Sequence, residues 1–374
     1  MEVNELLRTV ASYGLPGSRP AGPREPLAER AWDELVTHVR WQRITNLLAL
    51  AVTAGVIPAT ESQIAGAVDA DIEVLTSVLR LEAQLLEVAE VLDRAGAPFR
   101  VLKGPAVAHL DYPEPSLRSF GDLDLLIPPA AIDIAIEALS DEGYVRRFPE
   151  PRRGFDRRFT KSVSMVGPSG QQIDLHRTLA PGGFGQRIVV EVLWNSPPAT
   201  FAVGGRTFVA LGAEERFLHA CYHLVLGNAP PRLVPQRDVA EMLLHGHLAD
   251  DRVQILASAW HGEAVLAHAI TTTVRSLRLD IDTPIVSWAA QFKPYRRERR
   301  ELARATSPHY TYAAQAIDSI RAIRGSRERV AYVTALAFPR RSYLDGRHSS
   351  FAARFLHAAA DVQNVRTELK EKRD

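Results

Sequence analysis

The sequence predicts an α+β fold, in which a small mixed-sheet core is flanked by N-terminal helices and a C-terminal helical domain. Three observations lead to this prediction. Residues 28–95 are rich in Ala, Leu, Val and Glu, with apolar side chains three or four positions apart, as in packed helices. Residues 98–211 contain short strand-like runs bounded by Gly, Pro or Asp. From Ala213 onward the helical pattern returns.

These changes of pattern divide the chain of 374 residues into three expected regions. We expect an N-terminal helical region at 1–95, an α/β core at 96–211 and a C-terminal helical domain at 212–374. The length agrees, because one domain usually takes about 150 residues. Pro and Gly cluster at 14–26 and predict an irregular connector after a short first helix. Within the core, Gly204-Gly205 predicts a hairpin turn between two strands.

The composition is that of a globular protein and excludes several classes. Hydrophobic residues make up 46% and charged residues 24%, which argues against wholesale disorder. The single cysteine, Cys221, cannot form an intrachain disulfide, and we expect it to be a small buried apolar side chain. No apolar run approaches the roughly 20 residues of a membrane span, and the N-terminus lacks the pattern of a secretory signal. We therefore expect a cytoplasmic protein.

Asp122 and Asp124 form the strongest local signal, at the start of the apolar run 123–127. Residues two apart on a strand point to the same face, so the two carboxylates would lie side by side. Because like charges repel, one pKa should rise unless a cation compensates, and this favours a site for a hard divalent ion, Mg²⁺ or Mn²⁺. Two solvated carboxylates at a strand edge are the alternative.

Lys103, Gly104 and Arg118 are the candidate phosphate-binding residues. A strand-like run ends at Lys103-Gly104 and leads into a helical segment, where backbone N–H groups attract anions and Gly permits close approach. Arg118 comes four residues before Asp122, and a guanidinium is a good bidentate partner for phosphate oxygens. For Arg118 an ion pair with Asp122 or Glu114 is the alternative.

A third carboxylate, Asp174, precedes His176 on another strand-like run, 171–176. Alternation places both side chains on one strand face. Three acids on neighbouring strands would hold two Mg²⁺ ions that clamp a nucleoside triphosphate and stabilise the leaving pyrophosphate. In this arrangement Asp174 accepts the proton of the attacking hydroxyl, and His176 orients Asp174 or the acceptor.

These motifs together closely resemble an uncharacterised bacterial nucleotidyltransferase family within the DNA polymerase β-like superfamily. The resemblance covers roughly residues 81–248. It rests on strand-Lys103-Gly104-helix, Tyr112-Pro113, Arg118, Asp122-x-Asp124, Gly143-Tyr144 and Ile173-Asp174-Leu175-His176. It implies that the three acids bind two metals in a nucleotidyltransferase core. The usual helix-start Gly-Ser is replaced by Lys103-Gly104-Pro105, so phosphate contact would shift to Lys103.

The expected function is metal-dependent transfer of a nucleoside monophosphate from an NTP to a hydroxyl or phosphate of a small-molecule or peptide acceptor. The resemblance implies a setting in natural-product or polysaccharide biosynthesis. Two alternatives stay open. One is glycosyl transfer from a nucleotide-sugar with the same D-x-D metal site, and the other is a non-catalytic nucleotide- or peptide-binding scaffold.

Weaker signals follow in the C-terminal half. His219 and His223 are four apart on an expected helix and suit a zinc pair, a substrate contact or a packing role. Asp238 is most simply a helix N-cap, with a role beside the active site as the alternative. We expect His223 and Asp238 on the acceptor side of the site or next to it. Residues 290–374 hold 18 Lys and Arg against 9 Asp and Glu. This basic segment would suit an RNA acceptor or form a solvated helical face.

Overall fold

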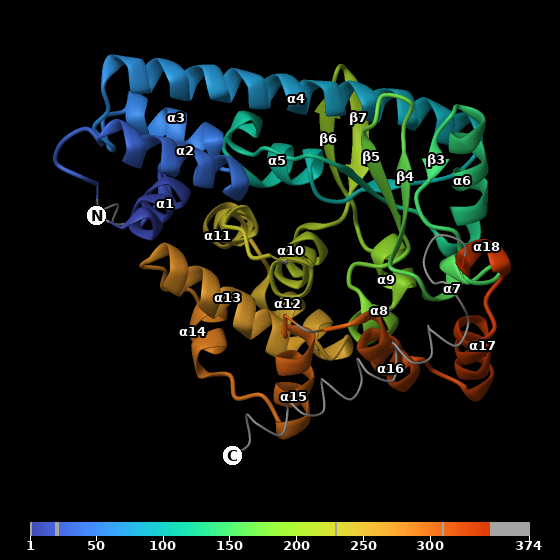
Figure 1. Ribbon diagram of the computed structural model, residues 1–374. Coiled ribbons are helices and arrows are strands. Elements are labelled where there is room, and N and C mark those ends of the chain that lie inside the picture. The colour runs from blue at the N-terminus through green and yellow to red at the C-terminus, as the bar shows by residue number, and fades with distance from the viewer. Residues whose placement is uncertain (1, 19–21, 229, 309, 345–374) are drawn as a thin grey trace.

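The computed structural model describes residues 2–18, 22–228, 230–308 and 310–344, and shows helices packed around one mixed sheet of seven strands (Figure 1). The α+β prediction is confirmed. The boundaries expected at 95 and 211 stay a prediction, and so does the role of the basic residues at 345–374, which lie outside the described residues. None of the described helices is both long and apolar enough to cross a membrane.

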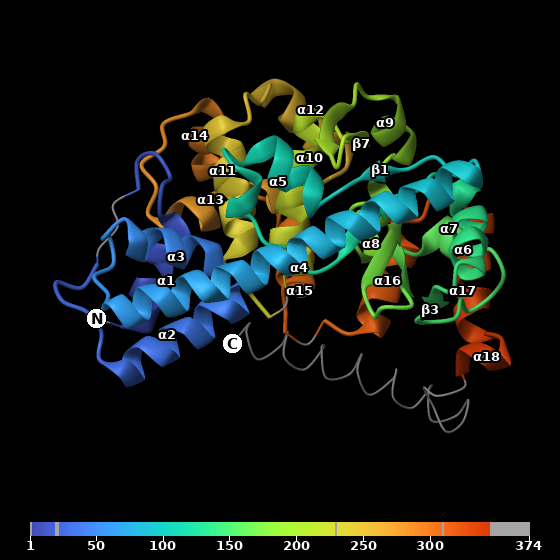
Figure 2. The ribbon, with the colours of Figure 1, turned by 90° about the horizontal axis from the view of Figure 1, so that it is seen from above.

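The N-terminal helices precede the sheet, and the last of them is the longest element described. Thr60 and Gln63 form a capping box that starts this helix, with the Gln63 N–H donating to Thr60 Oγ1 at 3.3 Å. Figure 2 shows it crossing the molecule from the other N-terminal helices to the sheet. The bounds are α1 (Val3–Ser12), α2 (Glu29–Gln42), α3 (Thr45–Thr53) and α4 (Glu61–Arg94).

The sheet has the strand order β3-β4-β5-β2-β1-β7-β6. The β2–β5 and β1–β7 pairs are parallel and the other neighbours are antiparallel. Gly204 and Gly205, both at positive φ, join β6 to β7, so the predicted hairpin turn is confirmed. The bounds are β1 (Arg100–Val101), β2 (Leu123–Leu126), β3 (Val145–Arg146), β4 (Ser162–Val166), β5 (Gln172–His176), β6 (Ala199–Val203) and β7 (Arg206–Ala210).

Further helices surround the sheet and make up the C-terminal half (Figure 1). Those between strands are α5 (Pro105–Asp111), α6 (Ile132–Asp141), α7 (Asp156–Phe159), α8 (Gly182–Arg187) and α9 (Val190–Asn195), with short 3₁₀ turns η1 (Pro115–Leu117) and η2 (Pro129–Ala131). After the sheet come α10 (Ala213–Tyr222), a π-helical turn η3 (His223–Gly227), α11 (Val234–His245), α12 (Asp250–Ala259), α13 (Glu263–Leu277), α14 (Pro284–Gln291), α15 (Arg296–Ala305), α16 (Tyr312–Ala322), α17 (Ser326–Ala337) and α18 (Arg341–Leu344).

The two faces of the sheet pack against different helices. Leu123 and Leu125 on β2 join a core with Leu85 and Val88 of α4. Leu126, on the opposite face, belongs to a second core with apolar side chains of α10, α11 and α13. This second core includes Cys221, which is buried as predicted, and burial raises the pKa of its thiol. The polar side chains of β2 and β5 therefore face α10 and α11.

Candidate active site

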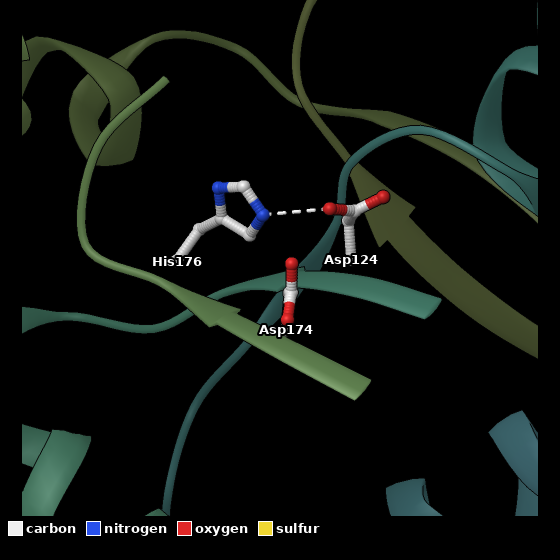
Figure 3. Close-up of side chains that lie close together, drawn as sticks. All are labelled: Asp124, Asp174 and His176. Carbon is white, nitrogen blue, oxygen red and sulfur yellow. Dashed lines mark hydrogen bonds and ion pairs between the residues drawn. The ribbon is translucent and has the colours of Figure 1, made fainter. Parts of the chain in front are cut away.

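The parallel pairing of β2 with β5 brings the predicted acids together. Asp124 lies directly opposite Asp174 in the register, and His176 follows two residues later on the same face. Figure 3 shows the three side chains pointing toward one another. One ligand atom from each lies within 4.8 Å of the others. Carboxylate oxygens are the donors that hard divalent cations prefer, so this donor set fits a metal ion.

Asp124 is the centre of the cluster and has both carboxylate oxygens engaged. It is only 2% exposed. Lys103 Nζ lies 3.0 Å from Oδ2, and His176 Nε2 lies 2.6 Å from Oδ1. Although burial by itself would raise the pKa of Asp124, Lys103 and the His176 hydrogen bond hold it well below its usual range. Asp124 is therefore ionised, and Lys103 supplies the compensating charge.

Asp122 directly precedes β2, so it is not on the strand with Asp124 as the alternation predicted, and it lies outside the group of three. Burial raises the pKa of Asp122, and repulsion from the Asp124 carboxylate raises it further. This is the direction expected for one member of a pair of like charges. The pKa values of the two carboxyl groups of the D-x-D pair therefore shift in opposite directions.

Asp174 is positioned by donors on its own strand and on β4. Ser164 Oγ donates to Asp174 Oδ1 at 2.5 Å, and Gln172 Nε2 donates to the same oxygen at 3.2 Å. Among the residues that the structure describes, none donates to the second oxygen, Oδ2. One face of this carboxylate is therefore held in place while the other can accept a proton or bind a cation.

Lys161 is a basic residue of the site that sequence reasoning missed. It directly precedes β4, and its carbonyl accepts a hydrogen bond from the Arg177 N–H at 2.8 Å. Burial, together with repulsion from Lys103, lowers the pKa of Lys161 to about 8, against the attraction of Asp124. A lysine just before a strand carries no distinctive pattern. Only the pairing of β4 with β5 places it beside the acids.

Arg118 is buried and paired with Asp238 of α11, so the expected alternative pairing with Asp122 or Glu114 is wrong. Its Nε and Nη2 donate to the two Asp238 carboxylate oxygens at 2.7 and 2.9 Å, and Nη1 donates to the Gly104 carbonyl at 3.1 Å. Because α11 begins at Val234, the interpretation of Asp238 as a helix cap is also wrong. The pair fixes Gly104 relative to α11.

Gly104 occupies a position that only glycine fits well. It has φ +55° and ψ −117°, a backbone conformation that side chains rarely adopt. A Cβ there would lie in ordinary contact with the Phe120 ring at 3.4 Å and the Asp122 carbonyl at 3.5 Å, so the backbone conformation alone favours glycine. The turn into α5 therefore lies directly against the segment that carries the D-x-D pair.

His219 and His223 lie on the helical side of the site. The His219 ring is buried and packs edge-on against His176, with ring centroids 6.3 Å apart. Burial, and to a lesser extent repulsion from the Lys103 ammonium, lowers the pKa of both imidazoles well below the usual value. Within the described part of the chain, the metal-type cluster contains neither of them. Both imidazoles are therefore uncharged at neutral pH. The role of His223 as an acceptor-side residue stays a prediction.

Comparisons with known proteins give one family match. A protein-family model described as "Uncharacterised nucleotidyltransferase" matches residues 28–277. Curated proteins give no match. A solved structure of an antigenic nucleotidyltransferase-like protein from Paracoccidioides brasiliensis is similar over 56% of this chain and 96% of that chain, with 15% identity and a TM-score of 0.32.

Proposed function

The chain belongs to the family of uncharacterised nucleotidyltransferases, and from this membership we propose that it transfers a nucleoside monophosphate from an NTP to a hydroxyl or phosphate of a small-molecule or peptide acceptor. The observation that carries the proposal is the β2–β5 register, which sets Asp124 against Asp174 with Asp122 beside them. The family resemblance favours a setting in natural-product or polysaccharide biosynthesis.

Divalent ions, Mg²⁺ or Mn²⁺, would be held by Asp122, Asp124 and Asp174, and would neutralise charge on the transferring phosphate and on the leaving pyrophosphate. The chain's own residues supply the rest. Asp174 Oδ2 accepts the proton of the attacking hydroxyl as the new oxygen–phosphorus bond forms and the α–β phosphoanhydride bond breaks. Lys103 and Lys161 place two ammonium groups beside the acids, where the phosphates of the NTP would bind.

The basic C-terminal segment is compatible with an RNA acceptor, which is a second candidate beside a small molecule or peptide. On α15, Arg296, Arg297, Arg299 and Arg300 are exposed, whereas Arg304 pairs with Asp318 of α16. Exposed arginines on one helix attract polyanions in a salt-dependent way. A labelled RNA included among the acceptors tests this directly.

The experiment uses ATP, CTP, GTP and UTP labelled on the α-phosphate, with Mg²⁺ or Mn²⁺ and a panel of acceptors. Label transfer with stoichiometric pyrophosphate release is expected from one of the nucleotides. Asp174→Asn should abolish it, while Asp141→Asn, which removes a carboxylate from the end of α6, should not. Transfer of a sugar from a nucleotide-sugar, without pyrophosphate release from any NTP, would refute nucleotidyl transfer.

A further inference from the structure

Arg43, at the end of α2, holds a strained backbone beside the acid cluster. It has φ +60° and ψ +41°, in the left-handed region. That conformation is uncommon for residues other than Gly, and it carries steric strain. The Ser119 hydroxyl donates to the Arg43 carbonyl at 3.0 Å and ties this turn to the segment before β2. The side chain is thereby aimed at Gly121 and Asp122.

The Arg43 guanidinium lies against the backbone of Gly121. A Cβ at Gly121 would be 3.1 Å from Nη2 and 3.4 Å from Cζ of Arg43, so a larger residue would push the guanidinium away. Gly121 directly precedes Asp122. The arginine from the N-terminal helices therefore sits one residue from the D-x-D pair.

The charge of Arg43 has no direct partner in the described part of the chain, where no carboxylate lies within 4 Å of it and its guanidinium donates no hydrogen bond. Burial lowers its pKa, against the attraction of Asp122. Arg118 differs, since Asp238 neutralises it. A partly buried charge without a partner is costly unless a ligand completes it.

Arg232 brings a second incompletely paired guanidinium to the same place. It lies over the ring of Trp41 on α2, with Cζ 5.7 Å from the ring centroid, and its repulsion acts on Arg43. The Arg232 Nε is buried and has no hydrogen-bond partner among the described residues. The Leu233 N–H donates to Gln42 Oε1 at 2.6 Å and holds this segment against α2. Among the described residues neither arginine has an ion-pair partner, and two such neighbouring guanidinium groups favour an anion.

A cleft of about 300 Å³ opens beside Arg43, between α2, α4 and the segment before β2. Ser77 and Ser119 line it with hydroxyl groups. At its rim Arg40 is balanced by Glu73, with Arg40 Nη2 3.5 Å from Glu73 Oε2, so the uncompensated positive charge is that of Arg43.

We propose that Arg43, which lines this cleft, and the neighbouring Arg232 bind a phosphate oxyanion of the substrate beside Asp122. The assignment of the anion to phosphate rests on the proposed nucleotidyl transfer. The phosphate belongs either to the polyphosphate of the NTP or to a phosphorylated acceptor. Both present the same oxyanion to a planar guanidinium, which matches phosphate oxygens in a bidentate fork.

The test is calorimetric titration of the full chain, in EDTA, with inorganic tripolyphosphate. Arg43→Gly is the informative variant, because glycine suits the left-handed backbone and the variant should stay folded. Arg278→Gly is the matched control: Arg278 also ends a helix, α13, in the left-handed conformation with φ +51°, but pairs with Glu5. Arg232→Met removes the second guanidinium and retains much of its apolar stem.

We expect Arg43→Gly and Arg232→Met each to weaken tripolyphosphate binding by about tenfold or more, and Arg278→Gly to leave it unchanged. A second arm titrates phenyl phosphate into protein saturated with a non-hydrolysable NTP analogue. Weakening in that arm alone assigns the phosphate to the acceptor. If neither ligand binds, or both bind Arg43→Gly as tightly as wild type, the inference is overturned. Failure of label transfer by the wild type would refute the proposed function and leave these titrations unaffected.

Discussion

Replacing Arg118 by Met should destabilise the fold rather than remove a phosphate ligand. The substitution leaves the buried Asp238 carboxylate with one short hydrogen bond, from the Tyr112 hydroxyl at 2.8 Å. It also removes one of the two hydrogen bonds to the Gly104 carbonyl, which keeps the one from the Ala108 N–H. Removing one partner of a buried ion pair costs about 3–5 kcal/mol, because the other charge stays buried without compensation. We therefore expect the free energy of unfolding to fall by about that amount.

Arg216 provides a matched control for this experiment. It donates from Nε and Nη2 to the two Asp111 carboxylate oxygens at 2.9 and 2.7 Å, and from Nη1 to the Leu211 carbonyl at 2.7 Å. The geometry reproduces that of the Arg118–Asp238 pair, and Arg216→Met should cost a similar amount. In the double variant Arg118→Met/Asp238→Leu the loss should be smaller than in Arg118→Met, because no orphan charge remains.

Urea denaturation followed by far-UV circular dichroism measures these free energies, and calorimetry measures tripolyphosphate binding under folding conditions. A structural role for Arg118 predicts that both arginine variants lose stability together. The reasoning is refuted if Arg118→Met unfolds within about 1 kcal/mol of the wild type while its tripolyphosphate affinity falls and that of Arg216→Met does not. That result would restore Arg118 as a phosphate ligand.

Three further predictions concern the charges of the site. Asp122→Asn should lower label transfer by on the order of a hundredfold or more, because it removes a metal ligand. It should also raise the urea midpoint at pH 7, because the raised pKa of Asp122 makes its ionised form unfavourable in the fold. Label transfer equal to that of the wild type would contradict the role of Asp122 as a metal ligand. His219 has a folded pKa below its unfolded value of about 6.5, so the unfolded chain binds the extra proton and stability falls as pH drops below that value. His219→Gln should reduce the difference between urea midpoints at pH 5.5 and 7.5, and an undiminished difference would exclude His219 as a contributor. Lys103→Met should strengthen Mg²⁺ binding measured by calorimetry, because a competitor for Asp124 is removed, and it should weaken NTP binding. If the variant loses both Mg²⁺ binding and NTP binding, Lys103 only stabilises the structure of the site.

The acid cluster was predictable because its determinants are local. Strand alternation sets Asp174 with His176, and the parallel pairing of two apolar strands sets Asp124 opposite Asp174. Asp122 directly precedes β2, so the expected alternation does not extend to it. The Arg118–Asp238 pair was not predictable, since its members are 120 positions apart and each has a plausible neighbour close in sequence. Lys161 was missed for a related reason: only the tertiary pairing of β4 with β5 brings it to the acids.

Lys103 reconciles the sequence-based expectation with the observed geometry. Each Asp124 oxygen already has one contact, so a cation that binds Asp124 would compete with Lys103 or His176 for it. His176 is fully buried, and its Nδ1 lies 3.3 Å from the Thr178 carbonyl, so it is held at both ring nitrogens. Lys103 is the more mobile partner, because its ammonium ends a flexible stem and its side chain is 14% exposed. Its charge therefore compensates that of Asp124, and a divalent ion held by Asp124 would take over this role and leave the Lys103 ammonium available to a phosphate.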